Sequence, residues 1–481
     1  MSFRSFLLRH RNFFQTKPIH KLLECTSGEF GLKKVLTSFE LTLLGVGAII
    51  GIGIFVITGI VAANYSGPAL FVSFIIAGLV CAFAALSYAE FAAMVPVAGS
   101  AYTYGYASLG EVWAWIIGWD LILEYSVSSA AVAVGWSGYM ANLLGGAGIV
   151  LPPALINPPG VNGGIINFPA ILIILLVTLL LVIGVKESAR INNIIVLVKI
   201  SVILLFLYLA SGHINPENWT PFMPFGWTGV FTGAAIVFFA YIGFDAVSTA
   251  AEEVQDPQKN LPIGIIGSLV IATVLYIAVS AVLTGIVPYT LLKDTSAPVA
   301  FALGYIGIGW GSALVSVGAI CGITSVLIVL LFGQTRIFFA MSRDGLLPGL
   351  FRELHPVFRT PFKVTLLVGM VTALIASLLP LQTIAELVNI GTLAAFIIVS
   401  LGVIVLRRTR PDLPRPFRCP FVPAVPILCI ISCGVLIALL PAVTHLRFVI
   451  WLILGLAIYV FYGSKHSRIN EETNSLECLK P

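Results

Sequence analysis

A lysine inside a long apolar segment is the residue of this 481-residue chain with the clearest capacity for chemistry. Lys199 stands in the run Val196–Val202, several helical turns from either end of the apolar stretch. An ammonium group at such depth in a membrane costs on the order of 3 kcal/mol, so it should face a polar cavity. Burial favours the neutral amine, which would let Lys199 load and release a proton. The alternative is a structural ion pair with an intramembrane carboxylate such as Glu124.

Two apolar segments contain glycines at places where they would weaken a continuous helix. The first segment has Gly47, Gly51 and Gly53 within seven residues, and the second is Phe239–Asp245, with one glycine. Unwound backbone offers N–H groups at one half-helix end and C=O groups at the other, which together suit a zwitterion. Paired interruptions of this kind predict the binding site of a transporter. Gly47 and Gly51, four residues apart, would also permit close helix packing without any break.

Acidic residues also occur within apolar segments, where each must be paired, protonated or hydrated. Asp120 and Glu124 are four residues apart and therefore share one face of a helix. We predict that Glu124 takes part in proton coupling, whereas Glu90, near the end of its segment, is interpreted as structural. Asp245 and Glu252 are predicted to have gating or structural roles.

Membrane-spanning helices must position these residues, because the composition leaves too little polar surface to cover a soluble globule. Hydrophobic residues make up 59% of the chain, charged residues make up 10%, and the mean hydropathy is +1.04. Each span needs roughly 20 apolar residues. The predicted fold class is an all-α polytopic membrane protein with twelve spans, near residues 39–61, 68–93, 111–141, 168–185, 191–211, 228–251, 262–287, 310–341, 363–380, 384–406, 421–442 and 446–463.

The distribution of basic residues supports this assignment and orients it. With a cytoplasmic N-terminus, all but three of the 26 Lys and Arg residues lie in the cytoplasmic segments or at the cytoplasmic ends of spans, the exceptions being Lys199, Lys293 and Arg447. We therefore predict a plasma (inner) membrane protein with both termini cytoplasmic and no removable signal peptide. Residues 1–38 would be a basic amphipathic segment on the membrane surface, or equally a disordered tail. Residues 465–481 would be a cytoplasmic tail.

Several other classes of protein do not fit the sequence. Basic residues do not cluster with aromatic ones, which argues against nucleic acid as a partner. The seven cysteines form no Cys-x-x-Cys pair and the histidines form no cluster, so we expect neither a disulfide framework nor a metal site. An enzyme would need clustered nucleophiles or metal ligands, and a channel would need rings of carboxylates or a symmetric filter. We predict no enzymatic activity, and no cofactor beyond the proton as coupling ion.

Five segments carry a resemblance to a known family: Gly47–Phe55, Tyr88–Tyr102, Ile242–Pro262, Arg336–Pro348 and Arg415–Arg418. Taken together they resemble the bacterial members of the cationic amino acid transporter family, within the amino acid, polyamine and organocation (APC) superfamily. The resemblance runs from about Lys17 to the C-terminal region. It implies a five-plus-five inverted-repeat core over residues 39–406, with the first and sixth helices broken at mid-membrane. Residues 407–464 would supply two further helices outside that core.

The resemblance also implies which atoms bind the substrate. The substrate carboxylate would meet the backbone amides of Ile52 and Gly53, and its amino group would meet the carbonyls of Ile49, Phe239 and Ile242. The substrate-binding positions expected on this basis are Ile49, Gly51, Ile52, Gly53, Phe239, Ala240, Ile242 and Ile323.

Three single positions refine what the resemblance implies. Lys199 matches a lysine thought to stand where sodium binds in sodium-coupled relatives, which favours proton symport. Ile52 occupies a place that is often Thr, so a hydroxyl is lost while the backbone amide remains. Ile323 falls where family members vary the residue that walls the side-chain pocket, and a β-branched residue there would narrow it.

The function predicted from the sequence is secondary transport of an L-amino acid with a proton by alternating access. The substrate would be small and neutral, with a cationic amino acid as the other option. An amino acid exchanger or a sodium-coupled carrier of the same fold is the alternative. The expected partners are the amino acid substrate, membrane lipid and, as a candidate, a small single-span membrane subunit, with no nucleic acid.

Overall fold

A computed structural model gives the arrangement of the chain. It describes residues 15–17, 34, 36–97, 100–183, 189–293, 295–358 and 360–468, with the backbone alone for 189–192 and 252. Most of the predicted N-terminal segment 1–38, and the predicted tail beyond residue 468, therefore lie outside the described residues.

Helices account for nearly all of the regular structure in the described residues. The longer α-helices are α3 (Ser38–Ile49), α5 (Leu70–Met94), α7 (Glu111–Gly146), α9 (Phe168–Ile183), α10 (Ala189–Ser211), α11 (Gly226–Val237), α12 (Pro257–Ile286), α14 (Gly309–Arg343), α15 (Phe362–Leu378), α16 (Leu381–Thr409), α17 (Ala424–Ala438) and α18 (Ala442–Ile458). The shorter ones are α4 (Thr58–Val61), α6 (Ser100–Ser108), α8 (Pro153–Ile156), α13 (Pro298–Tyr305) and α19 (Ser464–His466).

Tighter and wider helical turns connect or extend these helices. The π-helical segments are η1 (Gly53–Ile57), η2 (Ala62–Ser66) and η9 (Tyr459–Gly463). The 3₁₀ segments are η3 (Gly67–Ala69), η4 (Pro216–Trp219), η5 (Phe238–Tyr241), η6 (Asp245–Glu253), η7 (Tyr289–Leu292) and η8 (Gly349–Arg352).

The helices have the length and surface of a membrane bundle. Among the described residues, eight helical segments are long and apolar enough to cross a membrane, and α3, α9, α15 and α17 are shorter apolar helices. Helix is present in each range predicted to be a span. Large apolar side chains lie exposed on the outer helices, for example Leu179 at 55%, Leu374 at 60% and Ile453 at 62% exposure. Such a surface suits lipid as its solvent.

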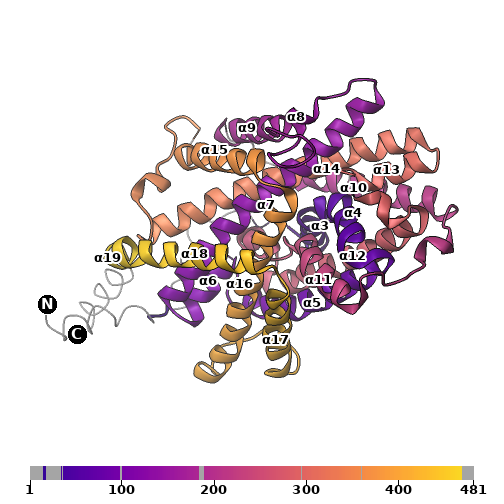
Figure 1. The fold of residues 1–481 in the computed structure, drawn as a ribbon. Helices are drawn as coiled ribbons and strands as arrows, with labels where there is room; N and C mark the ends of the chain where they lie inside the picture. The colour runs from indigo at the N-terminus through magenta and orange to yellow at the C-terminus, as the bar shows by residue number, and fades with distance from the viewer. Residues whose placement is uncertain are drawn as a thin grey trace, which may run out of the picture.

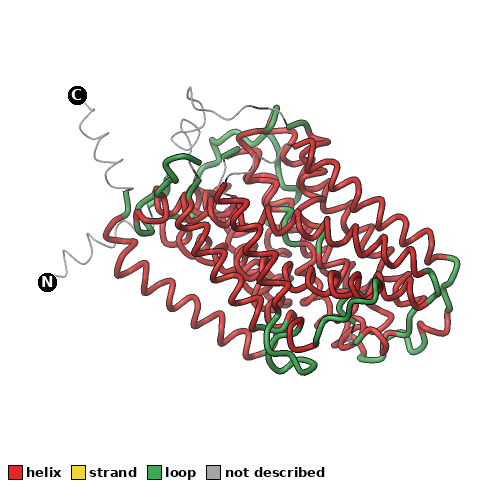
Figure 2. The backbone as a smooth tube through the Cα atoms, turned by 90° about the horizontal axis from the view of Figure 1, so that it is seen from above, coloured by secondary structure: helices red, strands yellow, loops and turns green. Residues whose placement is uncertain are grey.

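The bundle places α3 at its centre. Figure 1 shows α3 and α4 enclosed by the other helices, and α3 packs against α10, α12 and α14. The long helices α7 and α14 pack on one another, as do α5 and α12, while α9 and α15 lie side by side at one edge. In Figure 2 the connecting loops gather toward the ends of the bundle. Apart from the exposed Phe39 near its start, the residues of α3 are therefore buried or half-buried among neighbouring helices.

Candidate functional site

The central helix α3 stops within the bundle and does not run on into the next helical segment. It begins with a capping box, in which Thr37 and Glu40 satisfy each other's backbone N–H groups. After Ile49 the backbone is extended at Ile50 (ψ 99°), and helical structure resumes as the π-helix η1 at Gly53. Because the i→i−4 bonding is interrupted, carbonyls at the end of α3 are left without partners in their own helix.

A second interruption lies between η5 and η6. Ile242 is extended (φ −60°, ψ 135°), and Gly243 has φ +116°, a left-handed conformation that glycine adopts readily. A Cβ on Gly243 would lie 2.9 Å from the carbonyl carbon and oxygen of Ala48 in α3. A Cβ on Gly53 would likewise lie 2.5 Å from the Cα of Ala240. The two interrupted segments are therefore in direct backbone contact, and glycine is what permits it.

Lys199 of α10 reaches the carbonyls at the end of α3. Its ammonium donates to the carbonyl oxygens of Gly47 (2.8 Å) and Ile50 (3.2 Å), and the side chain is fully buried. Its aliphatic stem packs on Gly322 of α14, where a Cβ would lie 2.7 Å from the lysine Cγ. A cation at the C-terminal end of a helix is favourably placed with respect to the helix dipole. Lys199 thus joins α10 and α14 to the first interruption.

Tyr276 of α12 joins the two interruptions, and sequence reasoning did not single it out. Its buried hydroxyl lies 2.9 Å from the Ile49 carbonyl oxygen and 2.7 Å from the Ala240 carbonyl oxygen. A hydroxyl carries one proton, so the two carbonyls share one donor, and each keeps capacity to accept another hydrogen bond. Ile49 and Ala240, both predicted substrate-binding positions, are therefore brought together by this side chain.

Two of the predicted acidic residues, Glu124 and Asp245, lie next to the second interruption. Glu124 of α7 and Asp245 at the start of η6 are both buried and line one small cavity with Ile242. Asp120, one turn earlier in α7, is buried and neither of its carboxylate oxygens has a hydrogen-bond partner in the structure. The side chain of Glu252 lies outside the described residues. The structure thus places Glu124 and Asp245 together, beside the backbone break.

The side chains expected to wall the substrate pocket, Ile52 and Ile323, are both buried. Ile323 of α14 is fully buried and follows Gly322, the residue on which Lys199 packs. Ile52 lies against α7, where a Cβ on Gly135 would be 2.6 Å from its Cγ2. The neighbouring Trp136 donates from its indole nitrogen to the Thr324 hydroxyl (3.0 Å). Helix α7 therefore lies against Ile52 and η5 against Gly53, while α14 approaches Gly51 through Val326, 3.3 Å from a Cβ built there.

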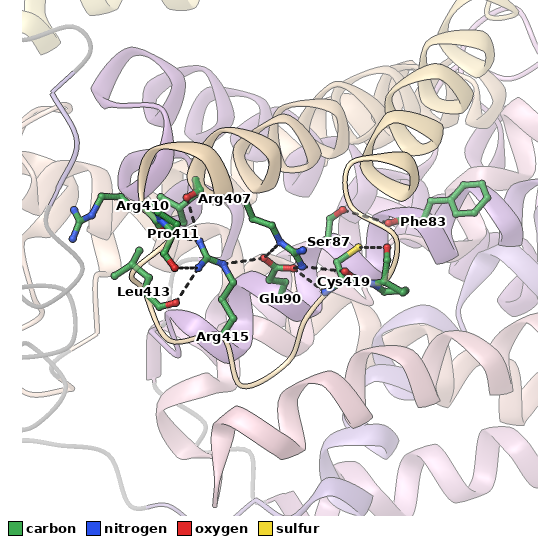
Figure 3. Close-up of polar contacts among 11 residues, drawn as sticks. Phe83, Ser87, Glu90, Arg407, Arg410, Pro411, Leu413, Arg415 and Cys419 are labelled. Carbon is green, nitrogen blue, oxygen red and sulfur yellow. Dashed lines mark hydrogen bonds and ion pairs between the residues drawn. The ribbon is translucent and has the colours of Figure 1, made fainter.

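Glu90 of α5 is the centre of a separate polar cluster, drawn in Figure 3. Arg407 of α16 binds its carboxylate with two hydrogen bonds, at 2.9 and 2.6 Å, and Arg415 lies 3.4 Å from it. The amide of Cys419 donates to the same carboxylate (2.8 Å). Burial, together with the Glu90 carboxylate, raises the pKa of the Cys419 thiol to about 12, so the thiol stays protonated at neutral pH. These contacts fix the linker between α16 and α17 to α5, which agrees with a structural role for Glu90.

Glu90→Gln is expected to lower the thermal unfolding temperature of the purified protein by several degrees. The Glu90 side chain is 3% exposed, and removing its charge would leave two arginines facing a neutral amide. Breaking a buried ion pair in this way costs about 3 kcal/mol. The matched control is Glu353→Gln, because the pair Glu353–Lys363 is 50% and 40% exposed and should be worth less than about 1 kcal/mol. Equal melting of the two variants would contradict the structural role.

Taken together, the apolar helices and the interrupted, buried core define a multi-pass helical membrane protein. Comparison with known proteins specifies the family. A family model described as "Amino acid permease" matches residues 36–462, and on that basis the chain belongs to the amino acid permease family, within the APC superfamily. The predicted family resemblance is confirmed.

Individual relatives agree with this family, and their names give different transported substrates. The chain is 53% identical over 461 residues to a branched-chain amino acid permease of Bacillus subtilis (strain 168), covering 95% of this chain and 99% of that protein. It is also 53% identical over 461 residues to a methylthioribose transporter of the same organism, covering 96% and 100%. A vacuolar cationic amino acid transporter of Arabidopsis thaliana is 33% identical over 565 residues, covering 92% of this chain and 94% of its own length.

Proposed function

We propose that this protein is a secondary transporter that takes up a small neutral L-amino acid together with a proton, by alternating access. The observation that carries the proposal is the ammonium of Lys199 on the Gly47 and Ile50 carbonyls, at the place where α3 ends. Loss of a proton from this amine would weaken both contacts, which would couple protonation to the geometry of the first interruption. The branched-chain amino acids are the first substrates to test, given the relative described above.

The substrate site in this proposal is the junction of the two interruptions. The amides of Ile52 and Gly53 would receive the substrate carboxylate, and the carbonyls of Ile49, Phe239 and Ile242 would receive its ammonium. Ile323 and Trp136 would flank the side chain of the substrate. A zwitterion uses donors and acceptors together, whereas a neutral thiosugar has neither a carboxylate nor an ammonium, so this arrangement favours an amino acid.

The proposed membrane arrangement has twelve spans, both termini in the cytoplasm, an inverted repeat over the first ten and interruptions at mid-membrane. Glu124 and Asp245, which share a cavity with Ile242, would relay the proton toward the cytoplasm. A sodium-coupled mechanism is less well supported, because the two carbonyl oxygens that could bind a hard cation already accept from Lys199. A small single-span subunit remains a candidate partner.

Uptake by proteoliposomes containing the purified protein tests the proposal. A gradient of one pH unit, acidic outside, is worth about 1.4 kcal/mol and should support up to about tenfold accumulation of L-leucine at one proton per substrate. L-Lysine and methylthioribose are measured in parallel as competing substrates. Equal uptake with and without the gradient would reject proton coupling. A requirement for internal counter-substrate would favour an exchanger, and a requirement for a sodium gradient would favour a sodium-coupled carrier.

A further inference from the structure

A second cavity lies at the end of the molecule where α14 and α18 finish. Its volume is about 380 Å³, which is in the range of small-ligand sites. One wall comes from the segment after α14, including Ser342 and Arg352, and the other from the segment after α18. Figure 1 shows α19 at the far end of α18, away from the central helix α3. This cavity is therefore separate from the site proposed for the amino acid.

The two walls of the cavity are fixed to one another by backbone contacts. The amide of Arg468 donates to the carbonyl of Asp344 (3.2 Å). Gly345 has φ +83°, and a Cβ there would lie 2.1 Å from the carbonyl oxygen of His466, so only glycine allows this approach. The hydroxyl of Ser467 donates to the buried carboxylate of Glu111 in α7. The cavity is thus a built feature of the fold.

Basic residues dominate the lining of this cavity. Arg352, Lys465, His466 and Arg468 all line it, and none of the other described residues that line it is acidic. Within the part of the chain that the structure describes, Arg352, Lys465 and Arg468 make no ion pair. Their heads are exposed at the cavity, and the ring of His466 stacks on Tyr462 at 4.2 Å. Basic side chains that converge in this way create a field that attracts anions.

Acidic residues that adjoin the walls of the cavity have other partners. Asp344 accepts from the Tyr102 hydroxyl (2.7 Å) and lies 3.5 Å from the ammonium of Lys17. Glu111 accepts from the hydroxyls of Tyr106 and Tyr459, both at 2.8 Å, in addition to Ser467. Asp344 is thus paired with Lys17, and Glu353, which follows Arg352, is paired with Lys363. The oxygens of Glu111 accept from three hydroxyls and form no ion pair with the basic side chains of the cavity.

The surface beside the cavity is apolar and outward-facing. Phe461 is 73% exposed and Val460 is 52% exposed, both in η9 next to the cavity-lining Tyr462. Further along α18, Ile453 is exposed in the same manner. A basic pocket at the end of a lipid-facing helix matches an amphiphile with an anionic head and apolar chains. Arginine and lysine together suit a phosphate head group.

We propose that this cavity, lined by Arg352, Lys465, His466 and Arg468, binds the phosphate group of an anionic phospholipid. The phosphate lies among the basic side chains, and the acyl chains follow the apolar face of η9 and α18. A free phosphate ester has the same head-group chemistry, and the two sources differ in whether the acyl chains are needed. This site is independent of the proposed transport activity.

Titration of the full-length protein in detergent tests the site, with phosphatidylglycerol, phosphatidylcholine and inorganic phosphate as separate probes. The wild-type protein is expected to bind phosphatidylglycerol more tightly than phosphatidylcholine. The triple variant Arg352→Gln, Lys465→Gln, Arg468→Gln should weaken phosphatidylglycerol binding by about tenfold or more. All three side chains are exposed, so folding should be preserved. Inorganic phosphate alone should bind at least tenfold more weakly than the lipid if the acyl chains contribute.

A second triple variant controls for net charge. Arg408→Gln, Arg410→Gln, Arg418→Gln removes three exposed cations that do not line the cavity, and should change the affinity less than about twofold. Equal weakening by both triple variants would overturn the site, because it would reduce the effect to general electrostatics. Inorganic phosphate that binds as tightly as the lipid would overturn the lipid assignment.

Discussion

Proteoliposomes containing Lys199→Ala are expected to take up no more L-leucine with a pH gradient than without one. In the wild-type protein a gradient of one pH unit should give up to about tenfold accumulation, and the variant should give none. The reason is local: the ammonium of Lys199 is the donor to the Gly47 and Ile50 carbonyls, and alanine can neither donate to them nor carry a proton. Binding of L-leucine, followed by thermal shift in detergent, should persist because the proposed substrate contacts are backbone groups of other residues.

Two further variants distinguish the loss of the Lys199 amine from the loss of side-chain volume at this position. Lys199→Met keeps most of the side-chain volume that packs on Gly322, so a protein that folds but shows no response to the gradient would assign the effect to the amine. Lys293→Ala removes an exposed lysine and should behave as wild type. If both Lys199 variants still accumulated L-leucine in response to the gradient, Lys199 would not be the proton-coupling residue. Glu124 and Asp245 would then be the candidates for that role.

The sequence was most informative where a residue type conflicts with its surroundings. Lys199 stands out because an ammonium group in an apolar segment needs polar partners, and the structure supplies them as carbonyls at the end of α3. The glycines around Gly51 and Gly243 stand out for the same reason, since glycine is a poor helix former in a span. Both glycine-rich stretches coincide with places where the helical backbone is interrupted.

Partnerships between distant segments were not predictable in the same way. Tyr276 occupies an apolar stretch, where tyrosine is an ordinary packing residue, and only the fold brings its hydroxyl to carbonyls of two other segments. The pairing of Glu90 with Arg407 and Arg415 likewise joins residues that are far apart in the chain. Spacing along one helix predicts a shared face, as for Asp120 and Glu124, but it carries no information about which helix packs opposite.

The basic cavity is a second feature that the sequence alone did not predict. Arg352, Lys465 and Arg468 were interpreted from the sequence as signals of membrane orientation, in line with the positive-inside rule. The positive-inside rule depends on how many basic residues lie on one side of the membrane. It does not predict which of their side chains lie close together. Only the close approach at Gly345 shows that two loops form one lined cavity. The same residues can therefore serve orientation and ligand binding.

Gly53→Ala is expected to abolish L-leucine uptake, lowering the initial rate by roughly 100-fold or more. The added Cβ would lie 2.3 Å from the Cβ and 2.5 Å from the Cα of Ala240, and backbone at that distance must move. Overpacking of this kind costs about 1–3 kcal/mol, which is too little to unfold a large bundle but enough to separate the two interrupted segments. Because the proposed site lies at their junction, the rate of uptake should fall far more than the unfolding temperature.

Comparison with other glycine and alanine variants identifies the cause of that loss. Gly434→Ala in α17 adds a Cβ with no atom within 4 Å, so it should leave uptake unchanged and stabilise the helix slightly. Combining Gly53→Ala with Ala240→Gly removes the Cβ contact but leaves the contact with the Cα, so recovery of uptake should be partial. If Gly53→Ala transported at the wild-type rate, contact between the two segments would not be a requirement of transport. The proposed ammonium site would then have to be abandoned, because it takes the carbonyl of Ile49 from one segment and those of Phe239 and Ile242 from the other.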